Sequence, residues 1–327
     1  MKPSLITKDL SIGYSNIDNP VLSGIDIQLH GGEFNCLLGA NGAGKSTLIR
    51  TLCGFQKKLG GEVSIDNLKL NRIFDVAKNI SVVLTDPVIS GNLTVYELVA
   101  LGRYPHTNWI MSLTESDKYE VQSALQTVGV VHLSDRNINE LSDGQLQKCQ
   151  IARALAQNCP IMILDEPTTH LDLNNRVEVM RLLRDLAHKE NKLILVATHE
   201  LDLALQMADY FLVISKSGIE KGVPEDLVLT GVLDEVFEMK GFDLKSGRAI
   251  FEPEEKLTTN VSGEGYPLLW TKNALERTGY SVISGLADIQ IQVSQDGENG
   301  LKWKVNFKNV NKKLHSIGQL IDFIKNL

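Results

Sequence analysis

The chain has 327 residues, 43% of them hydrophobic, and a net charge of −7. That length is comfortable for two domains, and the acidic balance excludes a nucleic-acid footprint spread over the whole sequence. The four cysteines lie in apolar stretches without a C-x-x-C pair, which favours buried, reduced thiols over disulfides or a metal site. No uninterrupted apolar run approaches the roughly 20 residues of a membrane helix, so action at a membrane would require a partner that spans it.

Strands and turns are predicted for residues 4–38. Ile25, Ile27 and Leu29 alternate with polar residues, which is typical of a strand with one buried face. Residues 34–38 form a short apolar run, as in a buried strand, and a helix is predicted over residues 46–52. The pattern therefore predicts a strand, a loop and a helix in succession.

The loop between that strand and that helix is rich in glycine. Residues 39–47 read GANGAGKST and fit the phosphate-loop pattern G-x-x-x-x-G-K-[ST]. Glycines let the backbone curl around phosphates and aim its N–H groups at them, and the helix N-terminus adds its dipole. The lysine supplies positive charge and the serine hydroxyl suits Mg²⁺. The predicted nucleotide-binding residues, which the resemblance described below assigns to ATP, are Gly39, Ala40, Asn41, Gly42, Ala43, Gly44, Lys45, Ser46 and Thr47.

Beyond the loop, the chain is predicted to build a sheet that is covered on both faces. Residues 62–66 are a short predicted strand, and residues 92–158 are predicted to be mostly helical. Three apolar segments follow at 161–164, 193–196 and 211–214, with helical segments between them. This alternation predicts a buried parallel sheet.

Two carboxylates end the first of these apolar segments. Asp165 is placed to hold Mg²⁺ directly or through water, and Glu166 is placed to polarise a water for attack on the γ-phosphate. The alternative is an ordinary strand end with solvated acids. The preceding phosphate loop favours the catalytic interpretation, because hydrolysis of a bound triphosphate uses both functions.

Residues 141–145, LSDGQ, precede a predicted helix that runs to residue 156. Ser142 and Gln145 have the spacing of a capping box, so a well-capped helix is one interpretation. Ser142 and Gly144 also leave an open, donor-rich helix N-terminus, which is the geometry that an anion favours.

Together, these motifs resemble those of the ATPase subunits of ABC transporters, where they occur in the same order. The matching segments are the phosphate loop, Leu141–Gln145 as the signature, Leu164–Pro167 as Walker B, Leu171–Asp172 as the D-loop, and Ala197–Glu200 with the switch histidine. The resemblance covers roughly residues 1–250. It implies an α/β P-loop NTPase cassette with a mixed sheet core and a helical subdomain at about residues 87–158, and ATP hydrolysis with ATP and Mg²⁺ as cofactors.

The resemblance implies roles for three residues within one subunit. Tyr14 corresponds to the aromatic residue that stacks on adenine, although a lone tyrosine is more often a core residue. His199 corresponds to the residue that contacts the γ-phosphate and aligns the attacking water with Glu166, although an isolated histidine after a strand is more often structural. Asp172 belongs to the D-loop.

A second set of implied roles involves two copies of the chain. In the family, Ser142, Gly144 and Gln145 belong to the motif that faces the ATP held by Lys45 of the other subunit. Two copies therefore sandwich two ATP molecules head to tail. The resemblance thus implies a homodimer whose closure needs both nucleotides.

The sequence departs from the family pattern in three places. Asp143 stands where the signature usually has glycine, and His170 stands where the D-loop usually has a small residue. Thr85 and Asp86 stand where the Q-loop usually has glutamine. A glutamine offers a neutral oxygen to Mg²⁺ and to water, whereas Asp86 could coordinate Mg²⁺ but would repel a bare γ-phosphate. The coupling between nucleotide and membrane partner depends on how this pair substitutes for glutamine.

Residues 93–107 resemble the iron-chelate branch of bacterial importers, which serves siderophores, haem and cobalamin. In the family this helical region docks the membrane subunit. The resemblance implies an ATPase that works with integral-membrane permease subunits and, indirectly, with a substrate-binding protein. It also implies a peripheral position at the cytoplasmic face of the inner membrane, and no nucleic-acid partner. The ATPase does not touch the cargo, so the sequence does not choose among these ligands. A solvated amphipathic helix with a loop is the alternative for this region.

A soluble ABC ATPase that acts on nucleic acid or the ribosome is the alternative function. Such proteins usually carry two cassettes in one chain or a long coiled-coil insert. This chain has one cassette and no sustained heptads, which favours the importer.

The pattern restarts after a polar, breaker-rich linker at residues 252–266. We therefore predict a cassette over residues 1–255 and a small α+β accessory domain over residues 256–327, with the order β-α-β-β-β-α. This domain would tune dimer geometry or sense a small ligand, and a passive appendage is the alternative. The predicted elements are strands at 267–270, 280–283, 289–293 and 301–307, a hairpin turn at 296–300, and a helix at 314–324.

Overall fold

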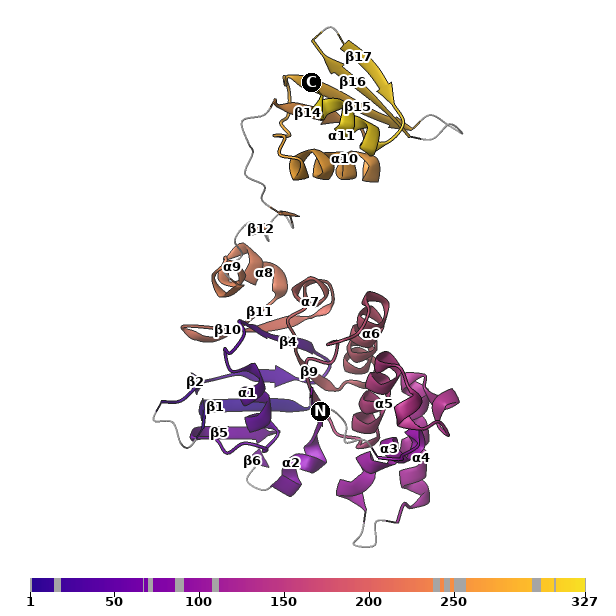
Figure 1. Cartoon of the computed structure of the whole chain (residues 1–327). Helices are drawn as coiled ribbons and strands as arrows, with labels where there is room; N and C mark the ends of the chain where they lie inside the picture. Colours follow the sequence, from indigo (N-terminus) through magenta and orange to yellow (C-terminus); the bar gives the residue numbers. More distant parts are fainter. Residues whose placement is uncertain are drawn as a thin grey trace. The chain divides into compact units, whose positions relative to one another are not determined.

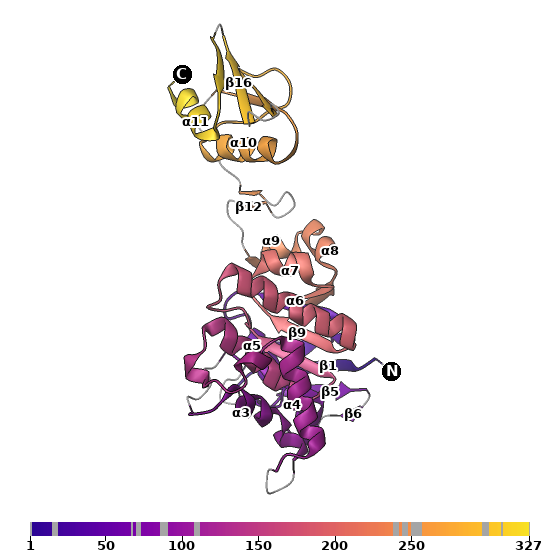
Figure 2. The ribbon, with the colours of Figure 1, turned by 90° about the vertical axis from the view of Figure 1, so that its right-hand side faces the viewer.

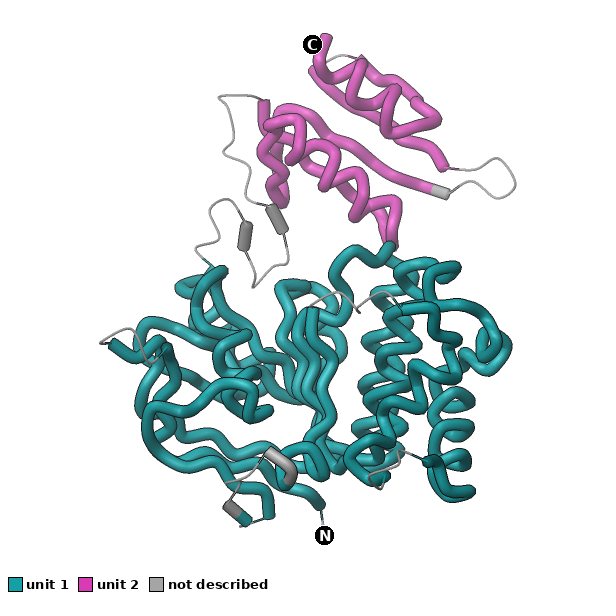
Figure 3. Tube along the Cα trace, turned by 60° about the horizontal axis from the view of Figure 1, so that its bottom comes forward, with its two compact units in different colours: residues 1–238 teal, residues 239–327 magenta. Residues whose placement is uncertain are grey.

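The computed structural model divides the chain into two compact units, residues 1–238 and residues 239–327 (Figure 3). The structure describes residues 2–14, 19–66, 68–69, 73–85, 91–107, 112–237, 242–243, 248–249, 257–295, 301–308 and 310–326. The predicted domain boundary at residues 255/256 lies outside these described residues, as does the predicted start of the helical subdomain at residue 87.

A six-stranded sheet forms the centre of the first unit. Its strands are parallel except for the antiparallel edge pair β10–β11. Every residue of β4, β8 and β9 is buried, as the continuous apolar runs predict. The strand order is β11 (Gly218–Gly222), β10 (Tyr210–Ser215), β4 (Phe34–Gly39), β9 (Leu193–Ala197), β8 (Ile161–Asp165) and β7 (Ile80–Val83).

A second, antiparallel sheet lies in the same unit (Figure 1). The predicted strand with Ile25, Ile27 and Leu29 is two short strands, both paired with β1, and all three side chains are buried. Its strands are β1 (Ser4–Ile12), β2 (Leu22–Ile25), β3 (Gln28–His30), β5 (Gly60–Ile65) and β6 (Leu68–Lys69). Helix α1 (Lys45–Leu52) contributes to the same apolar core as both sheets. The phosphate loop is therefore anchored at both of its ends in one core.

Helices surround the central sheet and also form a separate group (Figure 2). The group contains α3 (Val95–Ala100), η1 (Leu101–His106), α4 (Glu115–Val128), η2 (Val131–Leu133), η3 (Ile138–Glu140) and α5 (Asp143–Ala156). The predicted helical character of residues 92–158 is thus confirmed for the described residues. The remaining helices of the unit are α2 (Ile73–Asn79), α6 (Leu173–Glu190), α7 (Leu201–Met207), α8 (Pro224–Leu229) and α9 (Val232–Phe237). Among the residues that the structure describes, no helix has both the length and the apolarity to cross a bilayer.

A buried ion pair holds the helical group together. The guanidinium of Arg103 donates from Nε to Asp117 Oδ1 at 2.9 Å and from Nη1 to the carbonyl oxygen of Ala156 at 2.7 Å. Beside it, a β-carbon on Gly102 would lie 2.1 Å from the carbonyl oxygen of Arg153, so only glycine fits there. Gly102 and Arg103 therefore serve internal packing, whereas the neighbouring Tyr104 is exposed.

Asp117 makes the stability of this group depend on pH. Hydrogen bonds from Thr114, together with Arg103, lower the pKa of Asp117 from 3.8 to about 2. Its stabilising effect is therefore complete above about pH 4 and is lost as the pH falls through 2. We expect Asp117→Asn to destabilise the protein by about 2 kcal/mol at neutral pH. Urea unfolding followed by circular dichroism should show the gap to wild type closing between pH 4 and pH 2, and a constant gap would contradict this account.

The second unit contains a four-stranded sheet with two helices packed on one of its faces. Strand β14 is parallel to β15, and β15, β16 and β17 are antiparallel neighbours. Alternate residues of the strands share one apolar core with both helices, for example Ile291 and Val305 with Leu320. The elements are β12 (Phe242–Asp243), β13 (Arg248–Ala249), β14 (Thr259–Ser262), α10 (Gly265–Arg277), β15 (Ile289–Gln295), β16 (Leu301–Phe307), β17 (Val310–Leu314) and α11 (Ile317–Lys325).

This unit corrects three of the predicted elements. The order β-α-β-β-β-α occurs from β14 onward, but β14 lies inside the predicted linker and residues 267–270 are helical. Residues 280–283 form only an isolated bridge through Val282, and the predicted helix at 314–324 begins at Ile317, after its N-cap Ser316. Pro267 misled the prediction, because proline in the first turn of a helix loses no helical hydrogen bond.

Candidate functional site

The phosphate loop has the predicted context, since β4 ends at Gly39 and α1 begins at Lys45. Gly42 and Gly44 have φ angles of 80° and 104°, which side chains other than hydrogen disfavour. The Lys45 ammonium donates to the carbonyl oxygens of Gly39 at 2.8 Å and Ala40 at 3.2 Å. Burial lowers the pKa of Lys45, and the carboxylates of Glu166 and Asp165 oppose that shift. The loop therefore presents one partly desolvated positive charge at its centre.

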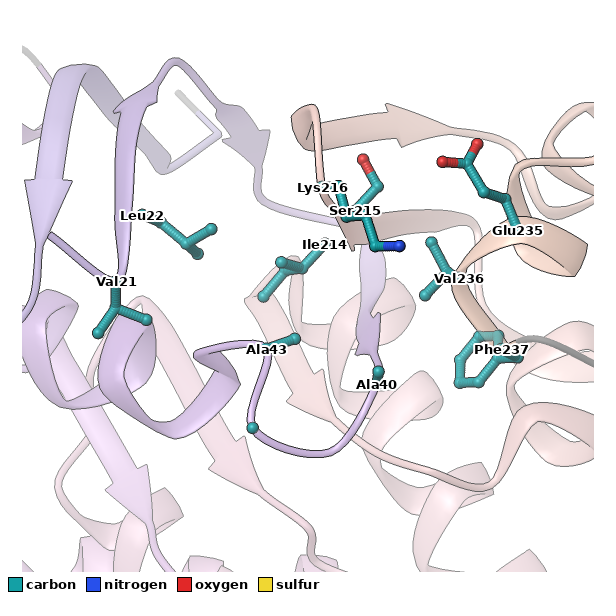
Figure 4. Close-up of a pocket in the computed structure, with 11 residues that line it drawn as sticks. Val21, Leu22, Ala40, Ala43, Ile214, Ser215, Lys216, Glu235, Val236 and Phe237 are labelled. Carbon is teal, nitrogen blue, oxygen red and sulfur yellow. The ribbon is translucent and has the colours of Figure 1, made fainter. Parts of the chain in front are cut away.

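A pocket of about 540 Å³ opens beside this loop (Figure 4). Ala40, Gly42 and Ala43 form its floor, and its walls come from segments far apart in the sequence. The other lining residues are Val21 and Leu22 at the start of β2, Ile214, Ser215 and Lys216 at the end of β10, and Glu235, Val236 and Phe237 of α9. Its lining is mixed, with apolar side chains such as Val21 and Phe237 beside the charged Lys216 and Glu235. Tyr14, the predicted adenine-stacking residue, lies just beyond the end of β1 with half of its surface exposed, and it does not line this pocket.

The donor set at the end of β8 fits a divalent cation. Asp165 is buried, and its Oδ1 atom has no hydrogen-bond partner among the described residues. Burial raises the pKa of Asp165, and a hydrogen bond with the Ser46 side chain works against this. An unpaired carboxylate oxygen beside a hydroxyl is the kind of oxygen donor set that Mg²⁺ prefers. Ser46 and Asp165 are therefore the residues that could hold a metal.

The structure brings the two predicted catalytic residues together. Glu166 Oε2 lies 3.3 Å from His199 Nδ1 and accepts a hydrogen bond from the Thr169 hydroxyl at 3.1 Å. Glu166 has a φ angle of 51°, an unusual conformation for a residue with a side chain, and its N–H donates to the carbonyl oxygen of Ala197 at 2.9 Å. The backbone of Glu166 is thus held in a strained conformation, and its carboxylate lies beside His199.

Of the two residues predicted to replace the Q-loop glutamine, the structure describes Thr85. The Thr85 hydroxyl donates to the backbone carbonyl of Asp165 at 3.0 Å, which ties the end of β7 to the two carboxylates. Asp86 lies outside the described residues. The role of the Thr85–Asp86 pair therefore stays a prediction.

The signature residues begin helix α5 as a capping box. Gln145 N–H donates to Ser142 Oγ at 3.3 Å, and Ser142 N–H donates to Gln145 Oε1 at 3.1 Å. Gly144 packs on helix α6, because a β-carbon there would lie 2.9 Å from Asn175 Cγ. Asp172 caps α6 and accepts hydrogen bonds from the backbone and side chain of Asn175, both at 2.9 Å. The start of the signature helix and the D-loop are therefore adjacent within one chain.

Sequence patterns missed two residues around this site. Thr169 contacts Glu166, and Arg176 joins the D-loop to Glu200. The three-residue spacing from Glu166 to Thr169 in a tight turn was a usable signal. No local pattern connects Arg176 with Glu200, because the fold brings these distant positions together.

The four cysteines are free and buried, as predicted.

Comparisons with known proteins identify the family of the chain. Residues 22–169 match the ABC transporter family, and residues 256–325 match the family described as the iron ABC transporter C-terminal domain. An uncharacterized ABC transporter ATP-binding protein of Methanocaldococcus jannaschii is 39% identical over 76% of this chain and 86% of its own length. A probable siderophore transport system ATP-binding protein of Bacillus subtilis is 34% identical over 72% of this chain and 86% of its own length.

Solved structures show the same fold. The structure of a putative metal-chelate type ABC transporter in an inward-facing conformation matches with a TM-score of 0.64 and 28% identity, over 72% of this chain and 90% of that one. A dimeric bacterial ABC transporter cassette matches with a TM-score of 0.59 and 25% identity, over 67% of this chain and 98% of that one. The chain belongs to the ATP-binding proteins of ABC transporters, which hydrolyse ATP.

Proposed function

We propose that this ABC transporter ATPase powers the import of an iron chelate, such as a siderophore or haem, or of cobalamin, through a separate membrane permease. The observation that carries the catalytic part is the distance of 3.3 Å between Glu166 Oε2 and His199 Nδ1. Glu166 directly follows the buried Asp165, which is the last residue of β8. The similarity to siderophore transport proteins and the match to the iron ABC transporter C-terminal domain support the choice of cargo. The same matches disfavour a soluble ATPase that acts on nucleic acid.

In this proposal, the residues of one subunit bind ATP and activate water. Lys45 contacts the β- and γ-phosphates, and the N–H groups of residues 39–47 hold the remaining phosphate oxygens. Tyr14 stacks on adenine. Glu166 orients the attacking water and accepts its proton, while His199 holds Glu166 in line and contacts the γ-phosphate. Ser46 and Asp165 would hold Mg²⁺, which neutralises phosphate charge when bound.

The second subunit completes each site. We infer that Ser142, Gly144 and Gln145 contact the ATP bound by the partner subunit, and that Asp172 lies near the same interface. The start of α5 is rich in N–H donors and carries the positive end of the helix dipole, and a helix N-terminus of this kind stabilises an anion such as the phosphates of ATP. The dimeric cassette among the similar structures supports two copies as the working unit.

The proposed partners follow from the family. Permease subunits would contact the helical group that carries residues 101–107, where Tyr104 is exposed and Arg103 is not. A substrate-binding protein would act only through the permease. The subunit would then lie at the cytoplasmic face of the inner membrane as a peripheral protein.

Replacing the proposed base should separate binding from hydrolysis. Glu166→Gln keeps a hydrogen bond to water but cannot accept its proton, so we expect ATP binding to persist and kcat to fall by about 10²- to 10⁴-fold. Steady-state phosphate release and binding of a fluorescent ATP analogue measure the two properties. Near-wild-type turnover would remove Glu166 from the proposed role.

The slow variant also tests the shared site. We expect Glu166→Gln to be monomeric without ATP and dimeric at saturating ATP, because each nucleotide would be bound by both subunits. Multi-angle light scattering with and without ATP reports the mass. In the double variant with Ser142→Arg, a bulky cation at the helix start should abolish the dimer, and an unchanged dimer would argue against the sandwich.

We further propose that residues 1–255 form the cassette and that residues 256–327 form a separate accessory domain that tunes dimer geometry or senses a small ligand. The independent apolar core of the second unit supports this division. Truncation after Glu255 should leave a folded protein with unchanged ATP affinity and basal turnover, and should alter only the regulation of transport. A truncated protein that is insoluble or that cannot bind ATP would show that the domain belongs to the cassette fold.

A further inference from the structure

Helix α6 carries an arginine that connects two parts of the site. Arg176 Nε donates to the carbonyl oxygen of Leu171 at 2.6 Å, and its Nη1 lies 2.7 Å from Glu200 Oε1. Leu171 belongs to the D-loop, and Glu200 directly follows His199. One planar guanidinium, whose donors have a fixed fork geometry, therefore links the D-loop backbone to the switch histidine's neighbour.

Glu200 depends on this contact. Its side chain is only 7% exposed, whereas that of Arg176 is 36% exposed. A buried carboxylate without a positive partner is unfavourable, so the arginine holds Glu200 at one place. Glu200 N–H donates to the Thr198 hydroxyl at 3.0 Å, and Thr198 N–H donates to the carbonyl oxygen of Leu37 in β4 at 3.2 Å. The residues on both sides of His199 are thus fixed.

His199 needs this support from its neighbours. Its side chain is 52% exposed, and its Nδ1 atom lies 3.3 Å from Glu166 Oε2. A half-exposed imidazole is not held in place by packing. The position of its backbone, set by Thr198 on one side and Glu200 on the other, therefore decides whether the ring reaches Glu166.

We propose that Arg176 is a positioning residue for hydrolysis, which keeps His199 in contact with Glu166 by fixing Glu200 against the D-loop. The inference rests on the proposed roles of Glu166 and His199. Arg176 acts through Glu200 and does not touch the reacting atoms. Because misplacing a catalytic group by about 1 Å costs on the order of 10²-fold in rate, losing this support should lower kcat and leave ATP binding intact.

The first measurement compares variants of the full-length chain. Arg176→Met should lower kcat by about 10- to 100-fold with less than a twofold change in the KM for ATP. Arg176→Lys should recover only part of the rate, because one ammonium does not reproduce the two-pronged contact. Arg184→Met removes the same charge from an exposed position on the same helix and should keep the wild-type kcat.

A second variant protects the test against misfolding. Arg176→Met leaves Glu200 buried without its partner, so a loss of stability could accompany it. The double variant Arg176→Met, Glu200→Leu has no unpaired charge. If it melts like wild type and binds the ATP analogue normally, its kcat should still be about 10-fold or more below wild type. A wild-type kcat in this double variant overturns the proposal.

The background variant His199→Ala separates positioning from a merely structural role. There, Arg176→Met should change kcat by less than twofold, because the group that it positions is gone. Single-turnover hydrolysis with excess enzyme extends the measurable range to slow variants. An equal loss in both backgrounds overturns the positioning role while His199 keeps its own. If His199→Ala alone hydrolyses ATP at the wild-type rate, the proposed function of His199 fails, and the inference fails with it.

Discussion

The register of three parallel strands is the constraint on which the site depends. Leu37 of β4 and Asp165 of β8 both pair with Ala197 of β9, so the three strands end at the same edge of the sheet. The phosphate loop begins at the end of β4, Asp165 and Glu166 lie at the end of β8, and His199 stands two residues after the end of β9. A shift of one residue in any strand would turn its side chains to the other face and would separate the groups. The apolar runs that bury the sheet therefore also set the geometry of the chemistry.

Strain at Glu166 is the local counterpart of that register. Its left-handed backbone lies where the strand turns away from the sheet, and the hydrogen bond to Ala197 fixes the turn. Such a conformation costs about 1–3 kcal/mol, which the buried strands on either side can offset. The backbone sets the direction in which the side chain leaves the strand end, and the contacts of its Oε2 atom with the Thr169 hydroxyl at 3.1 Å and with His199 Nδ1 at 3.3 Å then place the carboxylate.

Contiguous motifs made much of this site predictable from the sequence. Each of these motifs can be recognised from a few consecutive residues: the phosphate loop, the two carboxylates and the capping box at Ser142. The parallel sheet can be predicted from the spacing of the apolar segments. The Gly144–Asn175 contact and the Arg176–Glu200 pair were not predictable, because each joins positions that only the fold brings together. In the second unit, the predictions for residues 259–262 and 267–270 were wrong. The first segment is a short polar strand and the second is a helix that contains Pro267, because contacts with neighbouring strands and helices override weak local propensities there.

The hydrogen bonds of Lys45 within its own loop have a consequence for selectivity. Lys45 donates two hydrogen bonds to carbonyl oxygens of the loop, and an ammonium has three N–H donors, so one remains for a ligand. A lone chloride can accept from that donor but from few of the backbone N–H groups around it. A chain of phosphates offers many acceptors and can also occupy the backbone donors. The donors of this loop therefore match a chain of phosphates better than a single small anion.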